Sequence, residues 1–177
     1  MRRKIRELKP SDIDLILDYF LNADRAFLKT MGVEEKKLPT AEKWRQILLD
    51  DFDRSIDRRR FYYVIWEIDD APVGHSNINK IIYGQEAFMH LHLWQRKKRR
   101  NGHGVYFVKE SIANYFQTFD LEHLFCEPYA LNPAPNRTLA KVGFEFVRVY
   151  ETIPGWINFR QQVNRWVLSK EKWLQGL

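Results

Sequence analysis

The sequence predicts a single α/β domain in which one mixed sheet is covered by helices. The 177 residues, with 45% hydrophobic and 15% aromatic content, suffice for one compact core and are too few for two full domains. Apolar residues follow helical spacing in some segments and strand spacing in others. Pro and Gly fall singly between these segments, without a repeat or a low-complexity tract. We therefore treat residues 1–177 as one domain.

The N-terminal third is predicted to be a strand followed by two helices. Residues 3–9 form a short strand, and Pro10 and Ser11 open a helix whose apolar residues recur at helical spacing. A second helix starts at Thr40 and keeps the same period to Phe52. Each of these two helices carries one apolar stripe.

The rest of the chain is predicted to contain more strands than helices. Three strands, at residues 61–68, 73–82 and 86–94, are separated by turns short enough for an antiparallel meander. A third helix follows a glycine-bearing loop, because apolar residues from Val105 to Phe119 share one face. The remaining elements are a strand at 121–129, a helix at 136–142 ended by Gly143, and strands at 144–150 and 158–168. The predicted order is βααβββαβαββ.

Charge and cysteine content restrict the classes of partner. Lys and Arg total 29 against 23 Asp and Glu, and this net charge of +6 favours an anionic partner such as a phosphate-bearing ligand. The single Cys126 excludes an intrachain disulfide and a thiolate zinc cluster. No run approaches the ~20 apolar residues of a membrane span, and the first residues lack an apolar stretch of signal-peptide length. We therefore expect a cytoplasmic protein without a membrane partner.

The loop before the third helix is the most informative segment. Residues 96–100 are five consecutive cations, and Asn101, Gly102, His103 and Gly104 follow them. Glycines let backbone N–H groups approach an anion closely, while the helix N-terminus and the cations attract it, so a pyrophosphate is the natural ligand. A solvated basic turn or a nucleic-acid surface is the alternative for an isolated basic run. Neither the Rossmann nor the P-loop glycine pattern is present.

Two motifs and the order of elements together resemble the GNAT superfamily of acyl-CoA-dependent N-acetyltransferases. Residues 99–104, Arg-Arg-Asn-Gly-His-Gly, match its pyrophosphate loop: Arg or Gln, two residues, Gly, one residue, then Gly or Ala. Residues 132–144 resemble the N-x-x-S-x-x-x-L-x-K-x-G-F segment of the branch with ribosomal-protein N-terminal acetyltransferases of the RimJ and RimL type. The resemblance covers essentially the whole chain and implies a single-domain GNAT fold, with a mostly antiparallel mixed sheet and helices on both faces.

The resemblance also implies where acetyl-CoA binds. The pyrophosphate would lie on the loop, and the pantetheine arm would enter where residues 91–94 and 125–129 splay apart. Asn132 would contact that arm. The candidate cofactor-binding residues are Leu93, Trp94, Arg99, Arg100, Asn101, Gly102, His103, Gly104 and Asn132.

Proton removal from the acceptor amine calls for a base, and GNAT bases frequently lie on the third meander strand. Strand alternation places Glu86, His90 and His92 on one face, which is unusually polar for an interior strand. An imidazole pKa of about 6.5 suits proton removal near neutrality. We rank His92 and His90 first as catalytic bases and Glu86 next. The alternative is that the histidines are structural and hydrogen-bonded across the sheet.

The chain departs from the family at the general acid. Many relatives place a Tyr seven residues after the Asn and this branch a Ser three residues after it, whereas this chain has Leu139 and Pro135. The general acid that protonates the departing thiolate stays open between Tyr129 and solvent. Two histidines without a third ligand make no convincing metal site, so we expect none. Cys126 lies in an apolar strand without a flanking base, which favours direct transfer over an acyl-enzyme.

The function expected from these observations is acetyl-CoA-dependent transfer of an acetyl group to a primary amine, by direct attack in a ternary complex. The acceptor stays open between a small-molecule amine and a peptide N-terminus, although the basic balance does not favour a polycation. A non-catalytic acyl-CoA-binding module is the first alternative, because the family hydroxyls are missing. Nucleic-acid binding through residues 58–60 and 96–100 is a weaker one. Family members often dimerise, so the resemblance allows a homodimer.

Overall fold

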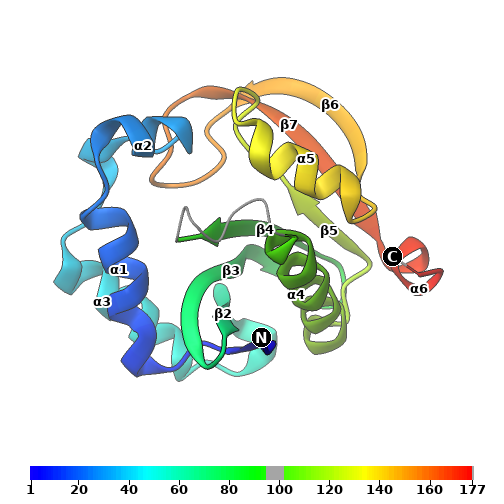
Figure 1. Ribbon diagram of the computed structural model, residues 1–177, viewed down its shortest axis with the longest axis horizontal. Helices are drawn as coiled ribbons and strands as arrows, with labels where there is room; N and C mark the ends of the chain where they lie inside the picture. The colour runs from blue at the N-terminus through cyan, green and yellow to red at the C-terminus, as the bar shows by residue number, and fades with distance from the viewer. Residues whose placement is uncertain (95–101, 177) are drawn as a thin grey trace.

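A computed structural model describes residues 1–94 and 102–176 of the chain. Its seven-stranded sheet has the strand order β1-β2-β3-β4-β5-β7-β6 (Figure 1). Neighbouring strands are antiparallel except β4 and β5, which are parallel. The expected mixed, mostly antiparallel sheet is therefore confirmed. Within the described residues, no helix has the length and apolar content that crossing a membrane requires.

The elements follow the predicted order, with two short helices added. The strands are β1 (Arg3–Glu7), β2 (Phe61–Ile68), β3 (Ala71–Ile82), β4 (Glu86–Leu93), β5 (His123–Cys126), β6 (Glu145–Thr152) and β7 (Gln161–Ser169). The α-helices are α1 (Ile13–Leu21), α2 (Arg25–Thr30), α3 (Ala41–Phe52), α4 (His103–Phe119), α5 (Pro133–Lys141) and α6 (Lys170–Leu174), and 3-10 turns lie at η1 (Pro10–Asp12), η2 (Glu35–Lys37) and η3 (Ile56–Arg58). The added helices, α2 and α6, have six and five residues, too few to show a helical period in the sequence.

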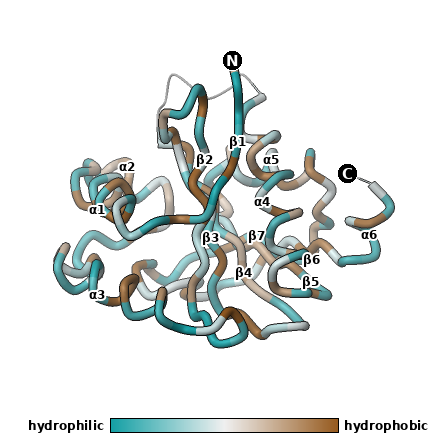
Figure 2. The backbone as a smooth tube through the Cα atoms, turned by 90° about the horizontal axis from the view of Figure 1, so that it is seen from below, coloured by the Kyte–Doolittle hydropathy of each residue, from teal (hydrophilic) through white to brown (hydrophobic). Residues whose placement is uncertain are grey.

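Helices cover both faces of the sheet, as the resemblance implies. On β2, Val64 and Trp66 face the core cluster that contains Phe107 of α4. Ile65 faces the second cluster, which contains Ile16 of α1. Figure 1 shows α1 and α3 on one side of the strands and α4 and α5 on the other. Figure 2 shows apolar and polar residues interspersed along the backbone.

β4 and β5 separate after three paired residues. The residues 86–88 pair with residues 123–125, and the described ladder between the two strands ends there. Beyond this point β4 stays beside β3, whereas β5 stays beside β7. An opening therefore lies between Met89–Leu93 and the chain that follows Cys126. The expected splay is confirmed, and it starts just after Phe125.

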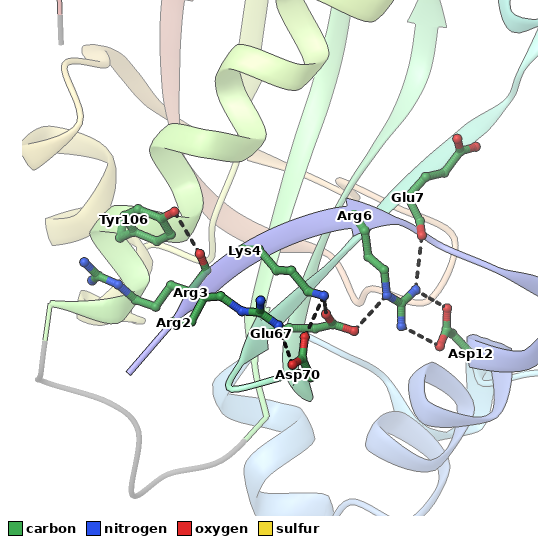
Figure 3. A network of polar contacts seen from close by, with 9 residues as sticks. All are labelled: Arg2, Arg3, Lys4, Arg6, Glu7, Asp12, Glu67, Asp70 and Tyr106. Atoms are coloured by element: carbon green, nitrogen blue, oxygen red, sulfur yellow. Dashed lines mark hydrogen bonds and ion pairs between the residues drawn. The ribbon is translucent and has the colours of Figure 1, made fainter.

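A polar network anchors the N-terminal strand to its neighbours (Figure 3). Arg6 Nε donates to Glu67 Oε1 at 2.7 Å, and its two terminal nitrogens donate to Asp12 at 2.6 and 3.0 Å. The Tyr106 hydroxyl donates to the Arg3 carbonyl at 3.2 Å. Burial acts to raise the pKa of Asp12, but the Arg6 hydrogen bonds, the Lys9 backbone N–H and the nearby positive charges together outweigh it, so the pKa is lowered. The network links β1, β2, η1 and α4 across the sheet edge.

The helix after β5 begins earlier than its sequence period predicts. Asn132 Oδ1 accepts from the Ala134 amide at 3.4 Å, and Pro133 occupies the first helical position, so α5 starts three residues before the predicted residue 136. Asn136 then joins the helix to β7, because its Oδ1 accepts from Asn164 Nδ2 and Trp166 Nε1, both at 2.8 Å. These contacts hold α5 beside the opening between β4 and β5.

The predicted strands at 121–129 and 158–168 are longer than, or offset from, β5 and β7. Pro128 cannot donate to a ladder, and only an isolated bridge joins Tyr129 to Val163. Residues 158–160 instead form a loop against the α2–η2 connection, where Asn158 bridges to Val33. The loops that follow β5 and precede β7 thereby approach the same opening.

Candidate functional site

A cavity of about 740 Å³ lies at the opening between β4 and β5. Leu93 and Val105, which pack on the α4 side of the sheet, line it together with the α5 segment that starts at Asn132. Tyr19 and His75, on the α1 side, line the same cavity. The cavity therefore passes through the sheet and joins its two faces.

The half of the cavity on the α4 side, called the first half below, has the features of an anion site. α4 is 17 residues long, and Gly102 caps its N-terminus with a φ of +74°, a left-handed conformation that favours glycine. A Cβ atom built at Gly102 or Gly104 would meet no described atom within 4 Å, so the backbone here is open to a ligand. His103 is buried and does not line the cavity. The candidate residues Arg99, Arg100 and Asn101 lie outside the described residues.

Two cations on α5, which the sequence analysis missed, add to this half. Arg137 and Lys141 both line the cavity, four residues apart and thus on one face of the helix. Their i, i+4 spacing is visible in the sequence, but only the docking of α5 beside the opening shows that this face meets the cavity. Together with the α4 N-terminus they make this half electropositive.

Of the three remaining cofactor candidates, two line the cavity and one does not. Leu93 and Asn132 line the cavity, one on each side of the opening. Trp94 does not line it; its side chain lies on the α1 side, where its Nε1–H donates to His75 Nδ1 at 2.8 Å. The predicted contact of Trp94 with the cofactor is therefore not supported by its side chain, which positions a histidine instead.

The half of the cavity on the α1 side, called the second half below, has a polar floor made by β3 and β4. Register pairs His75 with His92, Asn77 with His90, and Asn79 with Phe88. Directly paired residues share a face of the sheet, so these side chains form one surface on the α1 side. Below, "the polar floor" denotes His75, Asn77, Asn79, His90 and His92. The predicted alternation of β4 is confirmed. The ring centroids of His92 and Phe20 of α1 are 5.1 Å apart, whereas Met89 lies in the α4 core.

His75 and His92 form a stacked pair at the end of the floor that is nearest to Trp94. Their ring centroids are 4.8 Å apart with an interplanar angle of 24°. Because Trp94 donates to Nδ1, His75 carries its proton on Nε2. Burial lowers the pKa of His75 well below its usual value, and the two neighbouring histidines lower it further. His75 is thus a neutral structural histidine that supports His92.

His90 is also neutral at physiological pH. Burial lowers its pKa to about 4, with a smaller contribution from the charge of Lys80. Its Nε2 atom is buried and has no hydrogen-bond partner within the part of the chain that the structure describes. His90 therefore lines the cavity and carries an unsatisfied nitrogen, although a pKa of about 4 makes it a weak base.

Glu86, the third candidate base, is not brought together with the histidines. It pairs with Ile82 and His123 at the closed end of β4 and does not line the cavity. It shares the face of His90 by alternation, but it lies before the point where the strands separate. The geometry accordingly offers no support for its predicted role.

Glu127 is a site residue that the sequence analysis missed. It directly follows β5 and lines the cavity, and only 4% of its side chain is exposed. Its Oε1 accepts from the Tyr150 hydroxyl and lies 3.6 Å from Arg165 Nε. Phe88 and Phe125 are paired, with ring centroids 5.2 Å apart, so His90 and Glu127 follow two residues later on opposite sides of the opening. This period-two signal becomes readable only when the register is known.

The other candidates for chemistry have clear positions. Tyr129 lines the cavity, and its ring lies 5.7 Å from that of Phe159. Burial raises the pKa of the Cys126 thiol, which disfavours the nucleophilic thiolate. Leu139, at the position of the usual family Tyr, is fully buried in the α4-side core. Among the described residues, no three His, Cys, Asp or Glu side chains are grouped as metal ligands.

Comparisons with known proteins agree with this geometry. A family model described as an acetyltransferase (GNAT) domain matches residues 2–145. A search of the curated proteins finds no match.

Several solved structures share the fold. A spermidine N-acetyltransferase from Vibrio cholerae, in complex with CoA and spermine, has a TM-score of 0.78 at 16% identity, covering 97% of this chain and 98% of that one. RimL, a ribosomal-protein alpha-N-acetyltransferase in complex with coenzyme A, has a TM-score of 0.76 at 14% identity, covering 94% and 93%. An aminoglycoside acetyltransferase in complex with coenzyme A has a TM-score of 0.74 at 11% identity, covering 98% of both chains.

Proposed function

Because the chain belongs to the GNAT family of acetyltransferases, which use acetyl-CoA as the donor, we propose that it acetylates a primary amine by direct attack in a ternary complex. The observation that carries this proposal is the continuous cavity through the sheet. It joins an anion site at the α4 N-terminus to the polar floor on the opposite face. Donor and acceptor can therefore approach the β4–β5 opening from opposite sides.

The first half of the cavity fits acetyl-CoA. Its pyrophosphate would lie at the backbone of Gly102 and Gly104, with Arg137 and Lys141 supplying positive charge. Asn132 and Leu93 line the opening that the pantetheine arm would occupy. Bound acetyl-CoA supplies an acetyl group that its thioester activates toward an amine. Arg99, Arg100, Asn101 and His103 stay predictions as cofactor contacts.

The second half of the cavity provides groups that hold the acceptor and remove its proton. An amine reaches the cavity mainly as an ammonium ion, and the Glu127 carboxylate is placed to bind it and to accept a proton directly or through water. His92 and His90 stay candidate bases, and His90 is the weaker because its pKa is about 4. The amine nitrogen would add to the thioester carbonyl before the C–S bond breaks, and the departing thiolate would take a proton from Tyr129 or water.

Several further features belong to this proposal. The whole chain acts as one domain, since the sheet extends from β1 to β7. A cytoplasmic location is consistent with the single buried cysteine. A homodimer is consistent with β6, an edge strand whose Phe146, Val147 and Val149 are exposed.

A non-catalytic acyl-CoA-binding module is the second candidate, favoured by one observation. The family hydroxyls are absent, because Leu139 is a core residue and Pro135 has no hydroxyl. Nucleic-acid binding is less supported, because Arg60 pairs with Asp51 at 3.0 Å and Arg59 lies 3.8 Å from Glu7.

Thiol release from acetyl-CoA with a broad panel of amines separates the two candidates. An acetyltransferase releases CoA only when an amine is present, and mass spectrometry finds the amine heavier by one acetyl group. Acetyl-CoA binding, measured by calorimetry, provides the control in the same preparation. Binding without acetylation of any amine would contradict the enzyme and support the module.

A further inference from the structure

Aromatic rings form the wall of the cavity around the polar floor. The rings come from three helices, from β2 and from the β6–β7 connection, and they belong to Tyr19, Phe20, Phe27, Trp44, Tyr63 and Trp156. Their ring centroids are 6.0 Å apart for Tyr19 and Phe27, 5.3 Å for Phe20 and Trp44, and 5.6 Å for Trp44 and Trp156. Trp156, 43% exposed, lies at the outer end of this wall. The wall is thus a largely apolar surface that extends toward solvent.

Negative charge in the cavity is restricted to one carboxylate. Among the described residues that line it, Glu127 is the single acidic side chain. The carboxylates on the segments that flank Trp156 do not line the cavity, and each lies near a cation of this chain: Glu34 near Lys37 at 3.0 Å, Glu35 near Arg25 at 3.8 Å, and Glu151 near Arg160 at 3.6 Å. The protein as a whole carries a net charge of +6. A second ammonium group would therefore meet rings or repulsion rather than a carboxylate.

Unpaired hydrogen-bond acceptors of the polar floor, together with Glu127, can bind one ammonium group. Asn79 Oδ1 and His90 Nε2 are both buried and lack a hydrogen-bond partner in the described part of the chain. Glu127 lies across the opening from His90. A carbonyl oxygen, a neutral imidazole nitrogen and a carboxylate all accept hydrogen bonds, which matches the three N–H donors of a primary ammonium.

We propose that the acceptor carries one positive charge, as a primary amine on an aromatic or other apolar body, and is neither a polyamine nor an aminoglycoside. This inference rests on the acetyl transfer proposed above and specifies its acceptor. The ammonium binds between Glu127, Asn79 and His90, next to the opening, and the apolar body packs against the ring wall. Cation–π contacts would offset only part of the hydration that a second ammonium loses there.

Two acceptors of equal size test the charge directly. Hexylamine and 1,5-diaminopentane have the same number of heavy atoms and differ by a terminal methyl against a terminal ammonium. We expect kcat/KM to be at least about tenfold higher for hexylamine, and higher again for phenethylamine, because a buried site discriminates strongly against an unpaired charge. Equal or better rates with 1,5-diaminopentane or spermidine would overturn the proposal. A peptide that begins with Phe, assayed in parallel, distinguishes a polypeptide N-terminus from a free small amine, since both share the required chemistry.

A substitution that inserts a second carboxylate tests the wall. In Trp156→Glu the ratio of kcat/KM for 1,5-diaminopentane to that for hexylamine should rise about tenfold, with unchanged acetyl-CoA affinity. Phe146→Glu is the matched control, because Phe146 is 52% exposed on β6 and does not line the cavity. An unchanged ratio in folded Trp156→Glu would contradict the placement of the acceptor body.

The failure of transfer and the failure of this inference give different results. If amines are acetylated but diamines are preferred, only the inference fails. If acetyl-CoA binds and no amine is acetylated, the proposed transfer fails. Binding of hexylamine and 1,5-diaminopentane to the CoA-loaded protein, followed by tryptophan fluorescence, then still tests the charge preference: equal binding contradicts it.

Discussion

Gly102 and Glu127 show what single residues contribute on the two sides of the opening. Gly102 adopts a left-handed φ of +74° at the start of α4 and leaves its backbone exposed to the cavity. Glu127 is buried beside the opening, where Tyr150 and Arg165 hold its carboxylate. In the proposed function, Gly102 faces the phosphate of the donor and Glu127 faces the ammonium of the acceptor, on opposite faces of one sheet.

Replacing the glycines should weaken acetyl-CoA binding. Gly102→Val is expected to raise the Kd for acetyl-CoA by about tenfold or more, because a β-branched residue is strained at positive φ and obstructs the approach of an anion. Gly104→Val should act through obstruction alone, since a Cβ atom there meets no described atom. Calorimetry measures both, with circular dichroism as the control for folding. Unchanged affinity in two folded variants would contradict the anion site.

Replacing candidate bases should separate chemistry from donor binding. Glu127→Gln keeps the size of the side chain, and we expect kcat/KM to fall by about 10² to 10⁴ while the Kd for acetyl-CoA stays the same.

His92→Gln should lower kcat/KM by a similar factor if His92 relays the proton. The acidic limb of the pH profile should then shift only in the variant of the relaying residue, for acceptors of different amine pKa. If all three variants, including His90→Gln, kept wild-type rates and profiles, proton removal would proceed through water alone.

At the scale of elements, the pairing of β3 with β4 makes the floor and determines how it responds to acid. The two strands place His75, His90 and His92 on one face, beneath α1. Burial lowers the pKa values of His75 and His90, so both stay neutral in the folded protein at a pH where unfolded histidine binds a proton. The folded state therefore requires these two histidines to be neutral, and their protonation destabilises it.

Acid should destabilise the protein through these histidines. The unfolded pKa of histidine is about 6.5, and that of folded His90 is about 4. The stability contributed by neutral His90 is full above pH 6.5 and is lost as pH falls from about 6.5 to 4, by up to about 3 kcal/mol. His75 acts in the same direction. Urea unfolding at pH 7 and pH 4.5 should show a smaller acid loss for His90→Gln than for the wild type, whereas the exposed His123→Gln should behave as the wild type. An equal acid loss in all three proteins would contradict the assignment.

At the scale of the whole molecule, one sheet carries two cores and a passage between them. The α4 side and the α1 side each bury a hydrophobic cluster, and β2 contributes alternate residues to both. Figure 1 shows that the N-terminal helices and the β6–β7 connection approach the open end of β4 from the side opposite α4. The site is assembled from segments at both ends of the sequence, so its integrity depends on the entire fold.

This architecture predicts a single cooperative unfolding transition. Far-UV circular dichroism and tryptophan fluorescence should give coincident urea curves, because the two cores share the strands between them. Acetyl-CoA at about 100 times its Kd should add roughly 2.7 kcal/mol to the free energy of unfolding. Two separated transitions, or stabilisation of one core alone, would show that residues 1–177 are not one domain.

Local patterns in the sequence determined most of the architecture. Periods of two and 3.6 residues located the longer elements and assigned the faces of β4, because both periods depend only on neighbouring residues. The glycine and asparagine motifs predicted a cofactor side through their resemblance to the family, and this assignment stays a prediction. The short helices α2 and α6 escaped because they span fewer than two turns.

The tertiary structure alone decided which residues meet. Register brought Glu127 opposite His90 and left Glu86 at the closed end of β4, and the docking of α5 turned Arg137 toward the cavity. The indole of Trp94 bonds to His75 rather than reaching the cofactor side. These contacts join positions that are distant in the chain or on different elements. A periodic pattern specifies the face of an element, but the pairing between elements comes from packing in three dimensions.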